Sequence, residues 1–172
     1  MKNLLYQLEQ QNKEKQVLLE YLHTVPKEKL EFKKSKNEWC VNDVIQHIVL
    51  GEKEVVGNYL SIKILKSYKK TFKNKILYYV VMLILRLKIP INIPTETLQP
   101  IQHLNFIELQ QQWHESREQF RKHIENMHSS DLNKAFFIHP VCGPITTQQA
   151  LNLSQYHYKI HLSQINKILY KA

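Results

Sequence analysis

The sequence predicts an all-α protein organised as a four-helix bundle, and three observations support this prediction. Only 3 of the 172 residues are glycine, too few for the phosphate loops of a nucleotide-binding α/β fold or the hairpins of a β-sandwich. Apolar residues recur at helical spacing in long segments of the chain. Prolines at positions 90, 94 and 100 interrupt these segments. The length fits one domain spanning residues 1–172.

The first half of the chain contains two of the expected helices. The first should run from about Asn3 to His23 and end before Pro26, with a core face of Leu4, Leu5, Leu8, Val17, Leu18 and Leu19. The second should begin near Trp39–Asn42, and its later turns should continue into the lysine-rich stretch that follows. Its inward positions are Val44, Ile45, Ile48, Val55 and Leu60.

The second half contains the other two helices. Residues 89–100, with their three prolines, should form an extended crossing segment. A third helix fits Asn105 to His128, with Phe106, Leu109, Trp113, Phe120 and Ile124 in the core. Residues 139–144, HPVCGP, should form a loop. The last helix should begin with a capping box formed by Thr146 and Gln149 and continue to about Tyr170.

Most of the excess positive charge lies in one stretch. The chain has 24 Lys and Arg against 15 Asp and Glu, a formal net charge of +9. No acidic residue lies between Val55 and Thr95, where the basic residues are Lys63, Lys66, Lys69, Lys70, Lys73, Lys75, Arg86 and Lys88. Such a stretch attracts anionic lipid, nucleic acid or an anionic cofactor, although a solvated helix face has the same pattern. No nucleic-acid motif accompanies it, so nucleic acid is not an expected partner.

An apolar run, Ile76–Leu85, lies within this basic stretch. It is shorter than the roughly 20 residues that span a bilayer, so no transmembrane segment is expected. We expect the run to be buried against its own bundle or a second copy, which favours a homodimer. An element lying on a membrane surface is the alternative. We expect a cytoplasmic protein for two reasons. The chain begins with a polar segment, MKNLLYQLEQQNKEK, which does not resemble a signal peptide. It has only two cysteines, which are not expected to form a disulfide: Cys40 and Cys142.

Three histidines are candidate metal ligands. His157 and His161 are one helical turn apart and therefore share a face, a spacing that also occurs by chance in surface or core histidines. Tyr158 stands where a thermolysin-type helix has its glutamate, which excludes that class of protease. His47 lies in an apolar string and needs partners for its ring nitrogens. Antiparallel helices would bring all three to one height, although three unrelated histidines remain possible.

Two blocks of the sequence resemble the DinB-like superfamily of metal-dependent four-helix-bundle proteins. In EWCVNDVIQHIVLGE, Trp39, His47 and Glu52 follow the order of the family pattern. HPVCGPITTQQALNLSQYHYKIHLSQI matches the family's His-Pro, Gly and Thr loop, its His-x3-His pair and the Gln-Ile that follows. The resemblance extends from about Leu4 to Leu169 and implies helices in up-down-down-up order.

The resemblance also implies a function. His47, His157 and His161 would bind one divalent ion, zinc or nickel, with a position left open for water or substrate. The protein would be a metal-dependent enzyme acting on a small molecule, either a hydrolase or an S-transferase using a low-molecular-weight thiol such as bacillithiol. Two other classes stay open: a non-catalytic metal-binding or stress-associated protein, and a membrane-surface module built from Lys63–Leu85. The sequence assigns no catalytic residue.

Several further residues have two interpretations. Glu52, beyond His47 on the same helix, either orients a ligand or water or is a surface glutamate. His139 either faces the site or merely precedes Pro140. The two tryptophans, Trp39 and Trp113, are expected as core anchors. Cys40 stands where the family has a capping Ser or Thr, so Asn42 or Asp43 should cap the second helix instead.

Overall fold

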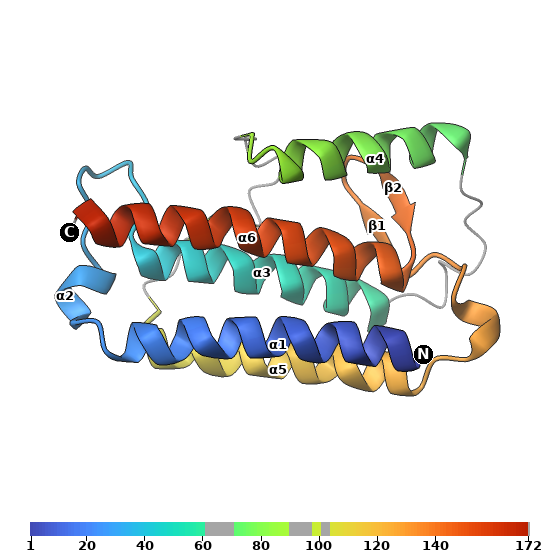
Figure 1. The fold of residues 1–172 in the computed structure, drawn as a ribbon, viewed down its shortest axis with the longest axis horizontal. Helices are drawn as coiled ribbons and strands as arrows, with labels where there is room; N and C mark the ends of the chain where they lie inside the picture. The colour runs from blue at the N-terminus through green and yellow to red at the C-terminus, as the bar shows by residue number, and fades with distance from the viewer. Residues whose placement is uncertain (61–70, 90–97, 101–103, 172) are drawn as a thin grey trace.

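The structure is a computed structural model that describes residues 1–60, 71–89, 98–100 and 104–171. This part of the chain is mostly helical. Its long helices α1 (Lys2–His23), α3 (Val41–Leu60), α5 (Phe106–Glu125) and α6 (Thr147–Lys171) pack side by side, and α4 (Phe72–Arg86) lies outside them along α6 (Figure 1). The shorter elements are α2 (Lys27–Leu30), the 3-10 turn η3 (Ser129–Asp131), and the strands β1 (Phe137–His139) and β2 (Gly143–Ile145).

Contacts between helices define their relative directions. His47 on α3 contacts His157 on α6, whereas Glu52, further along α3, contacts Ser154, which lies earlier on α6. The two helices are therefore antiparallel. Corresponding contacts from α1 show that α1 is parallel to α6 and antiparallel to α5 (Figure 1). The antiparallel arrangement of α3 and α6 decides which residues can meet in the interior.

Side-chain caps begin the helices at the expected places. The Gln149 backbone N–H donates to Thr146 Oγ1 at 3.2 Å, and the Thr146 N–H donates to Gln149 Oε1 at 3.0 Å. The predicted capping box of α6 is therefore confirmed. Before α3, the Cys40 N–H donates to Asp43 Oδ2 at 2.9 Å. Asp43 thus satisfies a donor at the start of a helix whose Cys40 side chain caps poorly.

The predicted continuation of the second helix into the basic stretch falls on residues 61–70, which lie outside the described residues; α3 is described to Leu60, and α4 begins after Thr71, where Thr71 and Asn74 form a capping box. Two other expectations about the elements were wrong. Residues 139–144 are not only a loop, because β1 pairs antiparallel with β2 and Phe137 lies opposite Ile145. Val17 is exposed because it lies off the buried stripe of α1. Residues 90–97 of the expected crossing segment lie outside the described residues.

The apolar core consists of two clusters. One contains Leu4, Leu8, Phe120, Ile124 and Leu151 among others, and the second contains Leu22, Ile45, Leu109, Trp113 and Ile165. On each long helix, buried polar residues separate the positions that belong to the two clusters: Gln11, Lys15, Glu52, Ser116 and Arg117, with the half-buried Ser154 on α6. All five predicted core residues of α5 are buried. The core is thus two apolar halves with a polar layer between them.

Two further expectations concern the whole chain. Cys40 and Cys142 are both buried free thiols, at the start of α3 and in the turn between β1 and β2, as predicted. Among the described residues, no helix has the combination of length and hydropathy that a membrane span requires.

Candidate metal centre

The structure brings together the three histidines singled out in the sequence. His157 Nε2 lies 3.1 Å from His47 Nε2 and 3.0 Å from His161 Nε2. One ligand atom from each ring lies within 4.8 Å of the other two. The antiparallel packing of α3 and α6 places His47 beside the His157–His161 pair, whose one-turn spacing directs both rings to the same face.

The outer ring nitrogens of two of these histidines are held by oxygen acceptors. His47 Nδ1 lies 2.9 Å from the Leu98 backbone carbonyl oxygen, and His161 Nδ1 lies 2.9 Å from Gln164 Oε1. A carbonyl oxygen can only accept, so each Nδ1 carries the ring proton. The Nε2 atoms of His47 and His161 therefore present lone pairs toward His157, as ligating imidazoles do.

The cluster has too few protons to satisfy its own contacts. His157 Nε2 carries at most one hydrogen, which can lie between it and only one of its two neighbours. At least one of the two short nitrogen–nitrogen approaches therefore sets lone pair against lone pair. A cation between the rings would remove this repulsion.

Burial keeps these rings neutral, so protonation of a second nitrogen does not remove the repulsion between the lone pairs. It lowers the pKa of His47, and it lowers the pKa of His161 to about 4. Burial, together with the charges of His161 and His47, holds the pKa of His157 well below its usual value. Neutral imidazole is the form that ligates metal ions. At neutral pH the cluster is thus already in its ligating form.

The donor set fits a borderline divalent cation. Zinc–imidazole bonds of about 2.0–2.1 Å place two ligands of a tetrahedral ion about 3.3 Å apart, close to the 3.0 and 3.1 Å separations in the cluster. Three nitrogen ligands suit zinc or nickel, between which affinity alone does not select. The residues that could hold the ion are His47, His157 and His161.

A small pocket adjoins the residues that support the cluster. Trp39 lies against His47, with ring centroids 5.1 Å apart. Trp39 and Gln164 line a pocket of about 220 Å³, together with Lys34 and Lys167. A larger groove of about 640 Å³ lies between α1 and α5. None of the three histidines lines either hollow, but the smaller one is lined by Trp39 and Gln164, which contact His47 and His161, and is therefore better placed for a substrate of this site.

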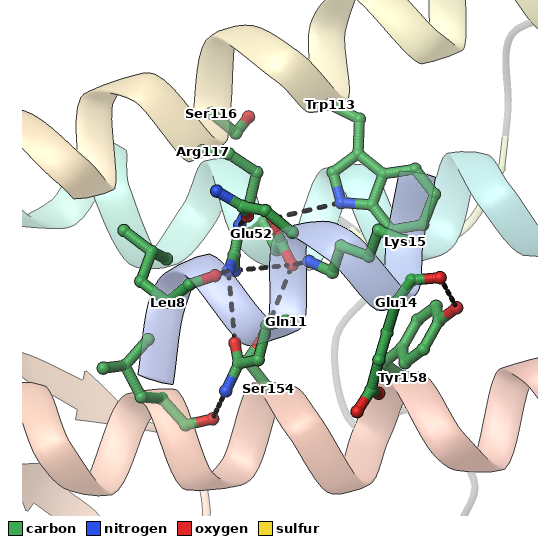
Figure 2. Close-up of polar contacts among 12 residues, drawn as sticks. Leu8, Gln11, Glu14, Lys15, Glu52, Trp113, Ser116, Arg117, Ser154 and Tyr158 are labelled. Carbon is green, nitrogen blue, oxygen red and sulfur yellow. Dashed lines mark hydrogen bonds and ion pairs between the residues drawn. The ribbon is translucent and has the colours of Figure 1, made fainter. Parts of the chain in front are cut away.

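The polar layer is centred on Glu52, which follows His47 on α3 (Figure 2 shows the layer). Its carboxylate binds Lys15 of α1, Arg117 and Trp113 of α5, and Ser154 of α6, so groups from three helices meet on one residue of α3. Burial alone would raise the pKa of Glu52, but the charges of Lys15 and Arg117 outweigh it and lower that pKa. The surface interpretation of Glu52 is therefore wrong. The carboxylate links the helices that carry the site.

The environment of Lys15 in this layer perturbs its pKa strongly. Burial and the nearby Arg117 charge lower its pKa to about 7, although Glu52 acts in the opposite direction. Neither Lys15 nor Arg117 was predicted to be buried. A signal was present, because the buried positions 4, 8, 11, 15, 18 and 22 of α1 form one stripe, in which Lys15 replaces an apolar residue. Arg117 occupies a buried position of α5 in the same way.

His139, on β1, has a defined tautomer. Its Nδ1 accepts from the backbone N–H groups of Val141 and Cys142 at 3.1 and 3.3 Å, so the neutral ring carries its proton on Nε2. A charge on His139 would lower the pKa of His157 further. Burial raises the pKa of Cys142 to about 11, so this thiol is not an activated nucleophile.

Comparison with known proteins identifies one family. A family model described as the DinB superfamily matches residues 10–165. The comparisons with curated proteins and with solved structures gave no match. The matched range contains the three histidines and the residues of the polar layer.

Proposed function

Because the chain belongs to the DinB superfamily, which is associated with metal ions, we propose that it is a metal-dependent enzyme in which His47, His157 and His161 bind one divalent ion. One observation carries the proposal: three neutral imidazoles converge with too few protons to satisfy their short contacts. Two of them are oriented from behind by Leu98 and Gln164, as the ligands of a metal usually are.

The metal would be zinc or nickel. When bound, such an ion acts as a Lewis acid and lowers the pKa of a thiol or water that it coordinates. The chain's own contribution is to hold the imidazoles neutral and oriented. Three protein ligands would leave a coordination position for a reactant.

The pocket beside the cluster supports a small anionic thiol as a reactant. Two lysines, Lys34 and Lys167, line it with one carboxylate, Glu38, so its lining carries a net positive charge that would attract an anion, and Trp39 supplies an apolar wall next to His47. The activity we propose is S-transfer, in which a thiol such as bacillithiol displaces a leaving group from an electrophilic small molecule. Hydrolysis of a small molecule at the same site is the competing reaction.

A conjugation assay tests this proposal. The zinc-loaded and nickel-loaded proteins would be given an aryl halide with either an anionic thiol, such as bacillithiol, or the neutral 2-mercaptoethanol. We expect halide release that the His157→Ala change abolishes. The double change Lys34→Gln and Lys167→Gln should raise KM for the anionic thiol and leave KM for the neutral thiol unchanged.

Other results would replace the proposal. Ester hydrolysis without thiol conjugation would assign the site to a hydrolase. A bound metal with neither activity would indicate a non-catalytic metal-binding protein. A purified protein that binds no divalent ion would exclude all of these functions.

A further inference from the structure

The helix α4 has two apolar faces, and only one of them packs against the bundle. Tyr78 and Val81 are buried, and Leu77, Met82 and Leu85 pack against the same core cluster. The opposite side is exposed: 78% of Phe72 and 70% of Tyr79 is accessible, and Ile76, Val80, Leu83 and Leu87 are exposed with them. The predicted burial of Ile76–Leu85 therefore holds for one half of the run, and the described residues leave the other half uncovered.

The exposed apolar residues form one continuous stripe. Successive residues of a helix are rotated by about 100°, so Phe72, Ile76, Tyr79, Val80, Leu83 and Leu87 fall within an arc of about 100°. We call this stripe the outer face of α4. It lies opposite the side that carries Tyr78 and Val81, on the helix that Figure 1 shows outside the bundle.

Basic side chains border the outer face on both sides. By the same rotation, Lys73 lies about 20° beyond one edge of the stripe, and Lys75 and Arg86 lie about 20–40° beyond the other. All three are exposed, as is Lys88 after the end of the helix, and the Arg86 guanidinium lies over the Tyr156 ring of α6, 5.5 Å from its centroid. The sequence from Val55 to Thr95 contains no acidic residue that would neutralise them. An apolar stripe with cationic borders is the pattern of a helix that lies in a membrane interface.

We propose that the outer face of α4 binds an anionic membrane surface. The helix would lie in the plane of the interface, with its apolar stripe among the acyl chains and its lysines at the headgroups. Its 15 residues give a length of about 22 Å, too short to cross the hydrocarbon core and sufficient to lie on it. This inference does not rest on the proposed function, because none of its residues belongs to the histidine cluster.

The basic borders favour an anionic membrane over a second copy of the chain and over nucleic acid. A second copy placed face to face would bring the basic borders of two identical helices together, since a two-fold interface uses the same patch twice. Nucleic acid would neutralise the lysines but would leave the six apolar side chains without an apolar partner. An anionic bilayer matches both the charge and the apolar stripe.

Vesicle sedimentation of the full chain tests the proposal. The protein would be mixed with vesicles of phosphatidylcholine alone, or of phosphatidylcholine and phosphatidylglycerol in equal amounts, at low and high salt. We expect binding only to the anionic vesicles, and weaker binding at high salt. The double change Val80→Asp and Leu83→Asp should lower the partition coefficient at least about tenfold. Changing Lys73 and Lys75 to Gln should lower it about fivefold per lysine.

A matched control is available elsewhere on the surface. Val17 on α1 and Ile107 on α5 are 67% and 70% exposed, and changing both to Asp should leave vesicle binding and the circular dichroism spectrum unchanged. If the Val80 and Leu83 variant loses helicity, the variant with Lys73 and Lys75 changed to Gln tests membrane binding instead. Both lysine side chains are exposed, so changing them should leave the fold intact.

Three outcomes would overturn the proposal. The first is an unchanged protein that does not sediment with the anionic vesicles. The second is a dimer that the Val80 and Leu83 changes convert into a folded monomer, which would show that a second copy covers the outer face. The third is a loss of binding in the control variant equal to that in the α4 variants.

Discussion

The Nε2 atoms of His47 and His157 lie 3.1 Å apart, although 110 residues separate the two histidines in the chain. The contact exists only when α3 and α6 are packed against each other. A cation held there would bind the folded state far better than the unfolded chain, and would stabilise the fold by mass action.

Metal content and stability should therefore depend on all three histidines. Each single change of His47, His157 or His161 to Ala should remove most of the bound divalent ion, measured by elemental analysis. Each should also remove the rise in melting temperature that added zinc gives the unchanged protein. His114→Ala, which alters an exposed histidine on α5, is the control and should keep the metal. Full occupancy in His47→Ala would refute the assignment.

Removing the charge of Glu52 should destabilise the protein strongly. Glu52→Gln would leave Lys15 and Arg117 buried without their counter-charge, at an expected cost of about 3–5 kcal/mol in the free energy of unfolding. Lys15→Met should cost at most about 1 kcal/mol, because it removes a desolvated cation and leaves Glu52 paired with Arg117. Urea unfolding of both variants measures the difference.

The same substitution at the surface is the control for Glu52. Glu9→Gln breaks an exposed pair with Arg121 and should change the free energy of unfolding by less than about 1 kcal/mol. If Lys15→Met lowered the free energy of unfolding as much as Glu52→Gln, the carboxylate of Glu52 would require Lys15 as a partner in addition to Arg117.

Lys15 should also make the protein more stable in alkali. Its pKa is about 7 in the folded state and about 10.5 in the unfolded state, so between these values the unfolded chain binds more protons. The free energy of unfolding should then rise with pH, by about 2 kcal/mol from pH 7 to pH 9. Urea unfolding at the two pH values tests this, and Lys15→Met should remove the rise. An equal rise in that variant would assign the effect to other groups.

Two glycines should respond in opposite directions to substitution by alanine. Gly143, in the hairpin, has a φ of +71°, and a Cβ there would lie 2.5 Å from Asn74 Nδ2. Gly143→Ala should therefore destabilise the fold by about 1–2 kcal/mol. Gly57, in α3, has nothing within 4 Å of such a Cβ, so Gly57→Ala should stabilise by about 0.5–1 kcal/mol. Thermal unfolding of both variants makes the comparison, and a stabilised Gly143→Ala would contradict the hairpin geometry.

Periodicity predicted the elements that have one apolar and one polar face. The core residues of α5 were found in this way, whereas the capped start of α6 was found from the capping-box motif of Thr146 and Gln149. It failed for α4, because a run that is apolar on all sides does not reveal which side packs. The hairpin was missed because its strands contain only three residues each.

The candidate site was predictable only in part. The spacing of His157 and His161 and the family pattern identified three residues that the structure brings together. The polar layer was not found, because Lys15 and Arg117 occupy inward positions where charge is usually excluded. Their partner Glu52 is 37 residues from Lys15 and 65 from Arg117, which no local pattern reveals.

The division of the three histidines between α3 and α6 also sets the order of events during synthesis. A ribosome adding roughly 5–20 residues per second needs about 5–20 s to pass from His47 to His157. Until then the nascent chain has one imidazole of the cluster and cannot complete the site. A metal bound by this cluster would therefore not guide the folding of the earlier helices, and would be captured only when α6 has docked. Loading would mark the end of folding, and metal release would report the separation of α6 from α3.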